Sequence, residues 1–354
     1  MASTSIEWTD TVWNPVVGCS RVSAGCLNCY AFALHDRRYA ANFRAARIWS
    51  GILEEGDRRI RNNEGWPQWV KRVGKPPEGW APRARKLGVR LPLPAQYDRP
   101  FSQVQLLPQR LEQPLHWRKP RRVFVNSLSD LFHEDVPDEF IAQVWITMAY
   151  SPQHTFQILT KRPERMRAII NPSVGIAGLL QAAGIAWPLP NVWLGVSVED
   201  QKTADERIPL LLQTPAAVRF VSYEPALAPV DFEGWLYGYC PEHDAPGLAC
   251  NHNQCKSAGK GLDWVIVGGE SGPGARPFYV EWARHTIAQC KAANVACFVK
   301  QLGSKPRFVS PINCEGTPEL LGIDFPLRLK DRKGSSPDEW PEHLRVREFP
   351  EVRA

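Results

Sequence analysis

The sequence lacks long apolar runs, a recognisable leader and the glycine fingerprint of dinucleotide-binding folds. No apolar stretch approaches the roughly 20 residues that cross a bilayer, which excludes a membrane-spanning helix. The opening MASTSIEWTDTVW has neither the basic region nor the apolar core of a secretory signal, so we expect a cytoplasmic protein. No G-x-G-x-x-G follows the first predicted strand, which disfavours a dinucleotide-binding open sheet.

The composition is that of a globular protein with one strongly basic segment. Hydrophobic residues make up 44% and charged residues 23% of the 354 residues, which excludes wholesale disorder. The net charge is only +6, but residues 58–90 contain ten Lys and Arg against two Glu, interleaved with Trp66, Trp69 and Trp80. A second basic run covers residues 116–122. Cations between aromatic faces are typical of nucleic-acid binding, and a solvated basic surface is the alternative.

Short runs of β-branched and aromatic residues alternate with helical patterns along the chain. Strands are predicted at 123–127, 156–160, 192–197, 218–222, 264–269 and 296–300, with weaker candidates at 15–18 and 103–107. Helical patterns cover 137–151, 205–214 and 279–294. Continuous apolar strands separated by helices indicate a parallel sheet. We predict an α/β fold in the form of a complete or partial (β/α) TIM-type barrel, with a doubly wound open sheet as the alternative.

The predicted barrel covers residues 1–303 and carries two insertions. Residues 45–100 are rich in Gly, Pro, Arg and Trp without clear periodicity, and residues 233–261 hold a cluster of Cys and His in a loop-like context. Residues 304–354 are Pro-rich and charged. We expect them to form an irregular C-terminal strap over the barrel.

Six of the nine cysteines fall in two clusters, which favours metal or redox chemistry over disulfides. The first cluster is Cys19, Cys26 and Cys29, with the spacing C-x6-C-x2-C just after the first candidate strand. Three thiolates on a short loop can hold three irons of a 4Fe–4S cluster. The fourth iron is then open to the amino and carboxylate groups of S-adenosylmethionine (SAM). A zinc site that includes His35, or unmetallated cysteines packed in a turn, are the alternatives.

The second cluster reads CPEHDAPGLACNHNQC over residues 240–255. Cys240, His243, Cys250 and Cys255 make a four-ligand set that suits a closed structural zinc site. The segment has few apolar residues, so a metal would be needed to order it. An auxiliary iron–sulfur cluster or no metal at all are the alternatives.

Polar groups and glycines follow each predicted strand, and in a parallel barrel these positions share one mouth. The candidate site residues at this rim are Asn126, Ser129, Asp130, Lys161, Ser197, Glu199, Glu224, Gly268, Gly269, Glu270 and Lys300. Carboxylates, amides and cations suit the polar groups of SAM. The Gly268–Gly269 pair, which has no Cβ atoms, can let backbone N–H groups approach a ligand.

Several motifs together resemble a known family. They include IEWTD (6–10), WNP (13–15), the three cysteines with Tyr30-Ala31, NSLSDLF (126–132), LTKRP (159–163), SYEP (222–225) and GGESGPGARP (268–277). The chain thus resembles the phage-associated three-Cys-motif family, which is radical-SAM-like. The resemblance implies that Cys19, Cys26, Cys29 and Tyr30 belong to the cofactor loop and that Ser197 and Glu199 contact SAM. It also implies an electron donor such as flavodoxin or ferredoxin.

The leading hypothesis is therefore a radical-SAM enzyme with a 4Fe–4S cluster, which generates a 5′-deoxyadenosyl radical from SAM and acts on a substrate in the barrel mouth. A nucleic acid or nucleotide is the expected substrate, for repair or modification. Two alternatives stay open. One is a non-enzymatic, zinc-containing nucleic-acid-binding protein, and the other is an iron–sulfur protein that binds SAM without turnover.

Overall fold

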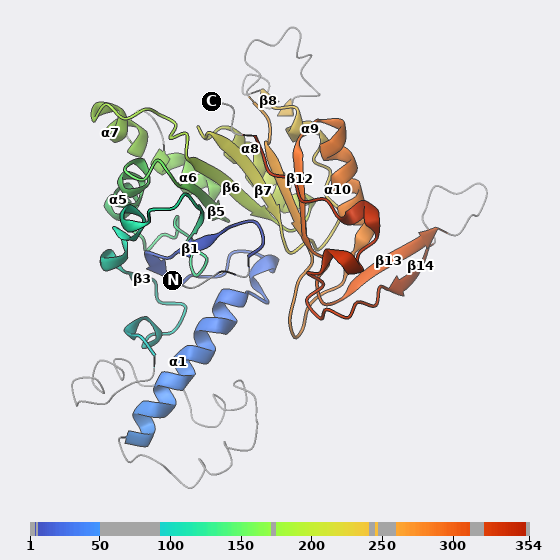
Figure 1. The fold of residues 1–354 in the computed structure, drawn as a ribbon, viewed down its shortest axis with the longest axis horizontal. Coiled ribbons are helices and arrows are strands. Elements are labelled where there is room, and N and C mark those ends of the chain that lie inside the picture. The colour runs from blue at the N-terminus through green and yellow to red at the C-terminus, as the bar shows by residue number, and fades with distance from the viewer. Residues whose placement is uncertain are drawn as a thin grey trace.

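The computed structural model describes residue 4 and residues 6–49, 93–170, 175–240, 245–246, 260–311 and 322–351. Its centre is a seven-stranded sheet, curled into an open half-barrel (Figure 1). In sheet order the strands are β1 (Thr11–Trp13), β4 (Arg122–Val125), β5 (Thr155–Thr160), β6 (Val192–Val198), β7 (Val218–Tyr223), β10 (Trp264–Gly268) and β12 (Ala296–Gln301). Every pairing in this sheet is parallel.

The strand order follows the chain from one edge of the sheet to the other. A doubly wound sheet would reverse its order at a switch point, so that alternative is wrong. The predicted parallel α/β barrel is confirmed in its partial form. The candidates at 15–18 and 103–107 belong instead to β2 (Val16–Val17) and β3 (Gln105–Leu106), which pair antiparallel outside the sheet.

Helices cover the outer face of the half-barrel (Figure 1). They are α5 (Asp138–Ala149), α6 (Pro163–Ile170), α7 (Ile176–Ala182), α8 (Gln201–Leu212), α9 (Glu233–Leu236) and α10 (Val280–Ala292). A further helix, α1 (Tyr30–Trp49), projects away from the sheet (Figure 1). The helix α1 was not predicted, and its end at Trp49 overlaps the segment 45–100 that we expected to be irregular. No helix in the described part of the chain is long and apolar enough to cross a membrane.

The sheet has an apolar core on each of its faces. Between the sheet and the helices, residues such as Val144, Ile158 and Val196 are fully buried. On the concave face, aromatic side chains fill the half-barrel, among them Trp8, Trp193, Phe220, Trp264 and Phe298. Because both faces are buried, the strands consist of continuous apolar residues, which is why they were recognisable in the sequence.

The chain after β12, which was expected to be an irregular strap, also contains two β-strands. The strand β13 (Pro306–Pro311) pairs antiparallel with β14 (Gly322–Pro326) and parallel with β11 (Phe278–Tyr279). The final segment then lies along the free edge of β12, where Val299 N–H donates to Val346 O and Glu348 N–H donates to Cys297 O. This tail covers the edge that an open sheet would otherwise expose.

Candidate functional site

The cysteine loop, residues 18–29, and the carboxyl ends of the strands surround one cavity of about 470 Å³. Of the predicted site residues, Cys19, Cys26, Cys29, Tyr30, Asn126, Ser129, Asp130, Lys161, Ser197, Glu224, Gly269, Glu270 and Lys300 line it. Residues far apart in the sequence therefore meet in one place, as expected for the mouth of a parallel barrel. Trp8 and Phe124 line the same cavity from the concave core.

All three thiols of the loop are partly exposed and line the cavity. The backbone N–H of Cys19 donates to Phe101 O at 2.9 Å, and Arg162 Nη1 lies 3.7 Å from Cys19 Sγ. Burial and the Asp130 carboxylate raise the pKa of the Cys19 thiol to about 11, although Arg162 opposes them. The thiol is thus protonated at neutral pH, and a metal would have to displace this proton in order to bind.

The arrangement of donors does not suit a single zinc ion. No three His, Cys, Asp or Glu side chains among the residues the structure describes converge on one metal position. His35, the candidate zinc ligand, is fully buried. Its Nε2–H donates a hydrogen bond to Arg99 O at 2.8 Å, and its ring packs on Tyr97 and Phe101. Thiols are also the donor type of iron–sulfur clusters, in which each cysteine binds a different iron and the cysteines need not meet at one position.

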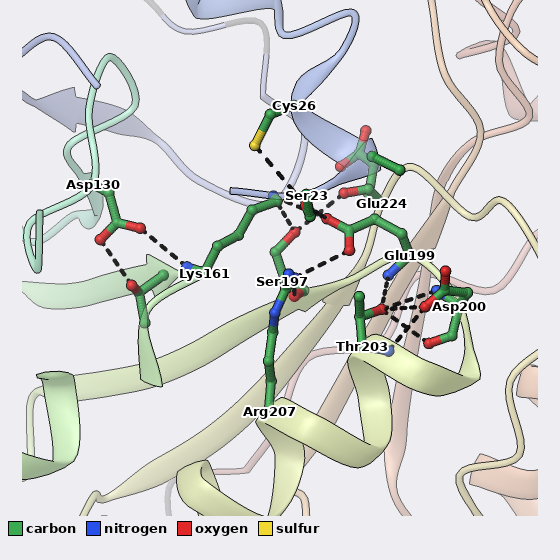
Figure 2. A network of polar contacts seen from close by, with 12 residues as sticks. Ser23, Cys26, Asp130, Lys161, Ser197, Glu199, Asp200, Thr203, Arg207 and Glu224 are labelled. Atoms are coloured by element: carbon green, nitrogen blue, oxygen red, sulfur yellow. Dashed lines mark hydrogen bonds and ion pairs between the residues drawn. The ribbon is translucent and has the colours of Figure 1, made fainter. Parts of the chain in front are cut away.

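Glu199 anchors one side of the cysteine loop (Figure 2). Its Oε1 accepts a hydrogen bond from Ser23 Oγ at 2.8 Å, and Arg207 Nη1 lies 3.1 Å from its Oε2. A Cβ atom at Gly25 would lie 2.3 Å from Oε1, so only glycine lets the loop approach this closely. Glu199 is fully buried and, unlike the other carboxylates predicted at the rim, does not line the cavity. It therefore holds the loop rather than facing a ligand.

Glu270 anchors the opposite side of the loop. Its carboxylate accepts hydrogen bonds from Asn28 Nδ2 at 2.9 Å and from Arg276 Nε and Nη2 at 3.0 and 2.6 Å. Arg276 Nη1 also donates to Ala24 O at 3.0 Å. Burial alone would raise the pKa of Glu270, but the hydrogen bonds from Arg276 and Asn28 outweigh it, so its pKa is lowered. Glu270 stays ionised and keeps the loop attached to the end of β10.

Asp130 joins the ends of β4 and β5. Its side chain accepts hydrogen bonds from Thr160 Oγ1 at 2.8 Å and from the N–H of Lys161 at 3.0 Å (Figure 2). Arg162 Nη1 lies 3.3 Å from the same carboxylate, and its Nη2 donates to Ser20 Oγ at 2.7 Å. The carboxylate therefore positions the arginine that in turn holds the cysteine loop beside Cys19.

The two lysines of the predicted rim are paired within the site. Lys161 Nζ donates to Ser197 Oγ at 2.7 Å and lies 3.6 Å from Glu199, while Lys300 Nζ contacts both Glu224 oxygens at 2.7 and 2.8 Å. The hydroxyl of Tyr30 donates to Ser127 O at 2.7 Å. These pairs balance the charges at the mouth and keep each side chain in one position.

The glycine pair at the end of β10 has a packing role. The N–H of Gly269 donates to Gln301 O at 2.9 Å and is therefore not available to a ligand. A Cβ atom there would lie 2.5 Å from Leu302 O. Gly268 is buried in the strand and does not line the cavity. The expectation that both residues open the backbone to a ligand is thus wrong for Gly269.

Several residues that hold the site were not singled out from the sequence. Ser23 and Asn28 tie the loop to the barrel, and Arg207 pairs with Glu199 beneath it. Lys333 of the tail lines the cavity, with its Nζ 3.4 Å from Glu7 Oε1. Arg276, which also holds the loop, is the one such residue that the sequence could have indicated, because it lies in the polar run after β10. The others come from a loop, a helix and a distant tail, whose approach to the cavity depends on the tertiary fold.

The predicted zinc and nucleic-acid sites are separate from this cavity or outside the described residues. Cys240 ends the short strand β8 (Tyr239–Cys240), which pairs with β9 (Ala245–Pro246), while His243, Cys250, Cys255 and the basic segment 58–90 lie outside the described residues. In the run 116–122, His116, Arg118 and Lys119 are exposed next to the amino end of β4. This run therefore lies at the end of the barrel opposite the cavity.

These features define a parallel α/β half-barrel with a three-cysteine loop over the carboxyl ends of its strands. A family model described as a protein of unknown function (DUF5131) matches residues 3–313. The chain belongs to this family. Searches of curated proteins and of solved structures each found no match.

Proposed function

We propose that the protein is a radical-SAM-type enzyme in which Cys19, Cys26 and Cys29 hold a 4Fe–4S cluster. The observation that carries the proposal is that the three thiols line one cavity at the carboxyl ends of parallel strands. When bound, the cluster and SAM would supply one-electron chemistry and a 5′-deoxyadenosyl radical for hydrogen abstraction from a substrate.

The contribution of the chain itself is orientation and exclusion of water. Glu199 and Glu270 hold the loop from two sides, so the thiols keep a fixed position relative to the cavity. Trp8 and Phe124 close the floor, with 2% and 8% of their surfaces exposed. A reactive intermediate needs such a shielded site, since water and stray donors would quench it. An external electron donor such as a flavodoxin or ferredoxin would complete the system.

Anaerobic reconstitution with iron and sulfide tests the proposal. We expect the chain to retain about four iron and four sulfide, the content of one such cluster, and to form 5′-deoxyadenosine from SAM after reduction with dithionite. A Cys19→Ala/Cys26→Ala/Cys29→Ala variant should lose the iron. Cys290→Ala is the matched control, because Cys290 is a buried free cysteine on α10 that does not line the cavity.

Equal iron content in the triple variant and in the wild type would contradict the proposal, provided that circular dichroism shows both to be folded. Retention of zinc without iron would favour the zinc-containing nucleic-acid-binding protein. A cluster that binds SAM but releases no 5′-deoxyadenosine on reduction would favour binding without turnover.

A further inference from the structure

The side chain of Arg162 lies between the Asp130 carboxylate and the Cys19 thiol. Its Nη1 donates to Cys19 Sγ at 3.7 Å and lies 3.3 Å from Asp130 Oδ2. Only 11% of the Arg162 side chain and 9% of the Asp130 side chain are exposed. Because burial reduces the screening of charges by water, the positive charge of Arg162 acts on this sulfur more strongly than a surface cation would.

The other nitrogen of the guanidinium group is held by the cysteine loop itself. Arg162 Nη2 donates to Ser20 Oγ at 2.7 Å and to Ser20 O at 3.3 Å. The N–H of Asp135 donates to His133 Nδ1 at 3.1 Å, so the neutral ring carries its proton on Nε2 and donates it to the same Ser20 Oγ at 2.8 Å. The guanidinium group is therefore fixed beside the sulfur of Cys19.

The three cysteines of the loop differ in this respect. The side-chain partner of Cys26 Sγ is the neutral hydroxyl of Ser23, at 4.0 Å. In the part of the chain that the structure describes, Arg162 is the only cation that donates a hydrogen bond to a thiol of the loop. Hydrogen bonds to the sulfurs and the net charge of the site are among the properties that set the reduction potential of an iron–sulfur cluster. Both act here through Cys19.

We propose that Arg162 is a positioning residue that stabilises the Cys19 thiolate as an iron ligand and raises the reduction potential of the bound cluster. The inference deepens the proposed function and rests on it. Reduction by one electron adds negative charge to a cluster and its thiolates, with no bond formed or broken. A cation in contact with one of the sulfurs therefore stabilises the reduced state more than the oxidised state.

The reduction potential of the reconstituted full-length protein is measured under argon by a redox titration that is followed by electron paramagnetic resonance. We expect Arg162→Gln, which removes the charge, to lower the equilibrium constant for one-electron reduction about tenfold, or by about 59 mV. A merely structural role would not lower the potential. A loosened loop would admit water, and water stabilises the more highly charged, reduced state.

Arg276→Gln is the matched control. Arg276 also holds the cysteine loop, by donating to Ala24 O at 3.0 Å, but it does not line the cavity and its charge is paired with Glu270. We expect its loss to change the potential much less than the loss of Arg162. Arg162→Lys keeps the charge but lacks the fork that contacts three groups at once, so its potential should lie between those of the wild type and Arg162→Gln.

A potential of Arg162→Gln equal to or above that of the wild type, or an equal decrease in Arg276→Gln, would overturn the inference. If Arg162→Gln does not fold or retains no iron, Arg162→Lys decides. Iron retained by the lysine variant supports the role of the charge, and loss of iron from both variants contradicts it. A wild-type cluster whose potential is insensitive to Arg162 sinks this inference alone, whereas a wild-type protein that assembles no cluster sinks the proposed function as well.

Discussion

At the scale of single residues, Gly25 decides how closely the cysteine loop approaches the barrel. A Cβ atom at this position would lie 2.3 Å from Glu199 Oε1 and 2.6 Å from its Cγ. Glu199 cannot move aside easily, because it is fully buried and paired with Arg207 and Ser23. The contact therefore makes the position of the loop sensitive to one methyl group.

We expect Gly25→Ala to shift the loop and to impair cluster assembly, with a stability loss of about 1–3 kcal/mol from overpacking. Iron content after reconstitution and the urea midpoint measure the two effects. Gly184→Ala is the control, because Gly184 has a φ of +74° but no atom within 4 Å of its Cβ position. It should lose stability by strain alone and keep its iron. Full iron content in Gly25→Ala would show that the loop does not depend on this contact.

At the scale of elements, an ion pair joins the start of β1 to the start of β4. Asp10 accepts hydrogen bonds from the N–H of Arg122 at 2.7 Å and from its Nη2 at 3.0 Å. Burial opposes ionisation, but the hydrogen bonds from Arg122 lower the pKa of Asp10 below its usual value. A lowered carboxyl pKa adds stability above the pKa of the unfolded chain, and this stability is lost as the pH falls through the folded-state pKa.

Asp10→Asn should therefore lower the free energy of unfolding at pH 7 and flatten its decrease on acidification below about pH 4. Because both side chains are about a third or more exposed, we expect only a few tenths to about 1 kcal/mol. Urea unfolding at a series of pH values measures the effect. Glu112→Gln, at an exposed carboxylate, serves as the control. It should leave the decrease of the free energy of unfolding at low pH unchanged. Parallel pH curves for Asp10→Asn and the wild type would contradict the argument.

At the scale of the whole molecule, the C-terminal tail packs against strands on the open side of the half-barrel. Phe349 contacts the rings of Trp264 and Phe298 at 5.3 and 5.4 Å, and Arg122 lies over its ring at 4.2 Å. Trp264 Nε1 also donates to Glu348 O at 2.9 Å. The tail thus links β10 and β12 to β4 across the open side of the sheet, with residues beyond the 3–313 matched by the family.

We expect Phe349→Ala to destabilise the protein by roughly 1–2 kcal/mol, because the ring is partly exposed and loses only part of a full burial energy. Phe325→Ala is the matched control, since Phe325 is similarly exposed and stacks on Phe308 in the β13–β14 hairpin. The thermal midpoint and tryptophan fluorescence report the difference. A larger effect at Phe325 than at Phe349 would show that the tail does not close the barrel.

The sequence by itself determined the position of every strand of the sheet except the first, together with the polar residues that follow these strands and the three-cysteine loop. Continuous apolar runs such as 192–197 and 264–269 reveal strands buried on both faces, and their alternation with helices allows few arrangements. The first strand of the sheet, Thr11–Trp13, was missed because three residues carry no periodicity. The helix that begins at Tyr30 was missed because its apolar and charged residues are mixed around its circumference.

Only the tertiary structure decided what each polar residue at the mouth does. Glu199 and Glu224 both follow apolar strands, yet one is buried beneath the cysteine loop and the other lines the cavity. The tail reaches β12 from more than forty residues away, a contact with no local pattern. Periodicity reports which face of an element is buried, whereas the partner of a side chain depends on the packing of distant segments.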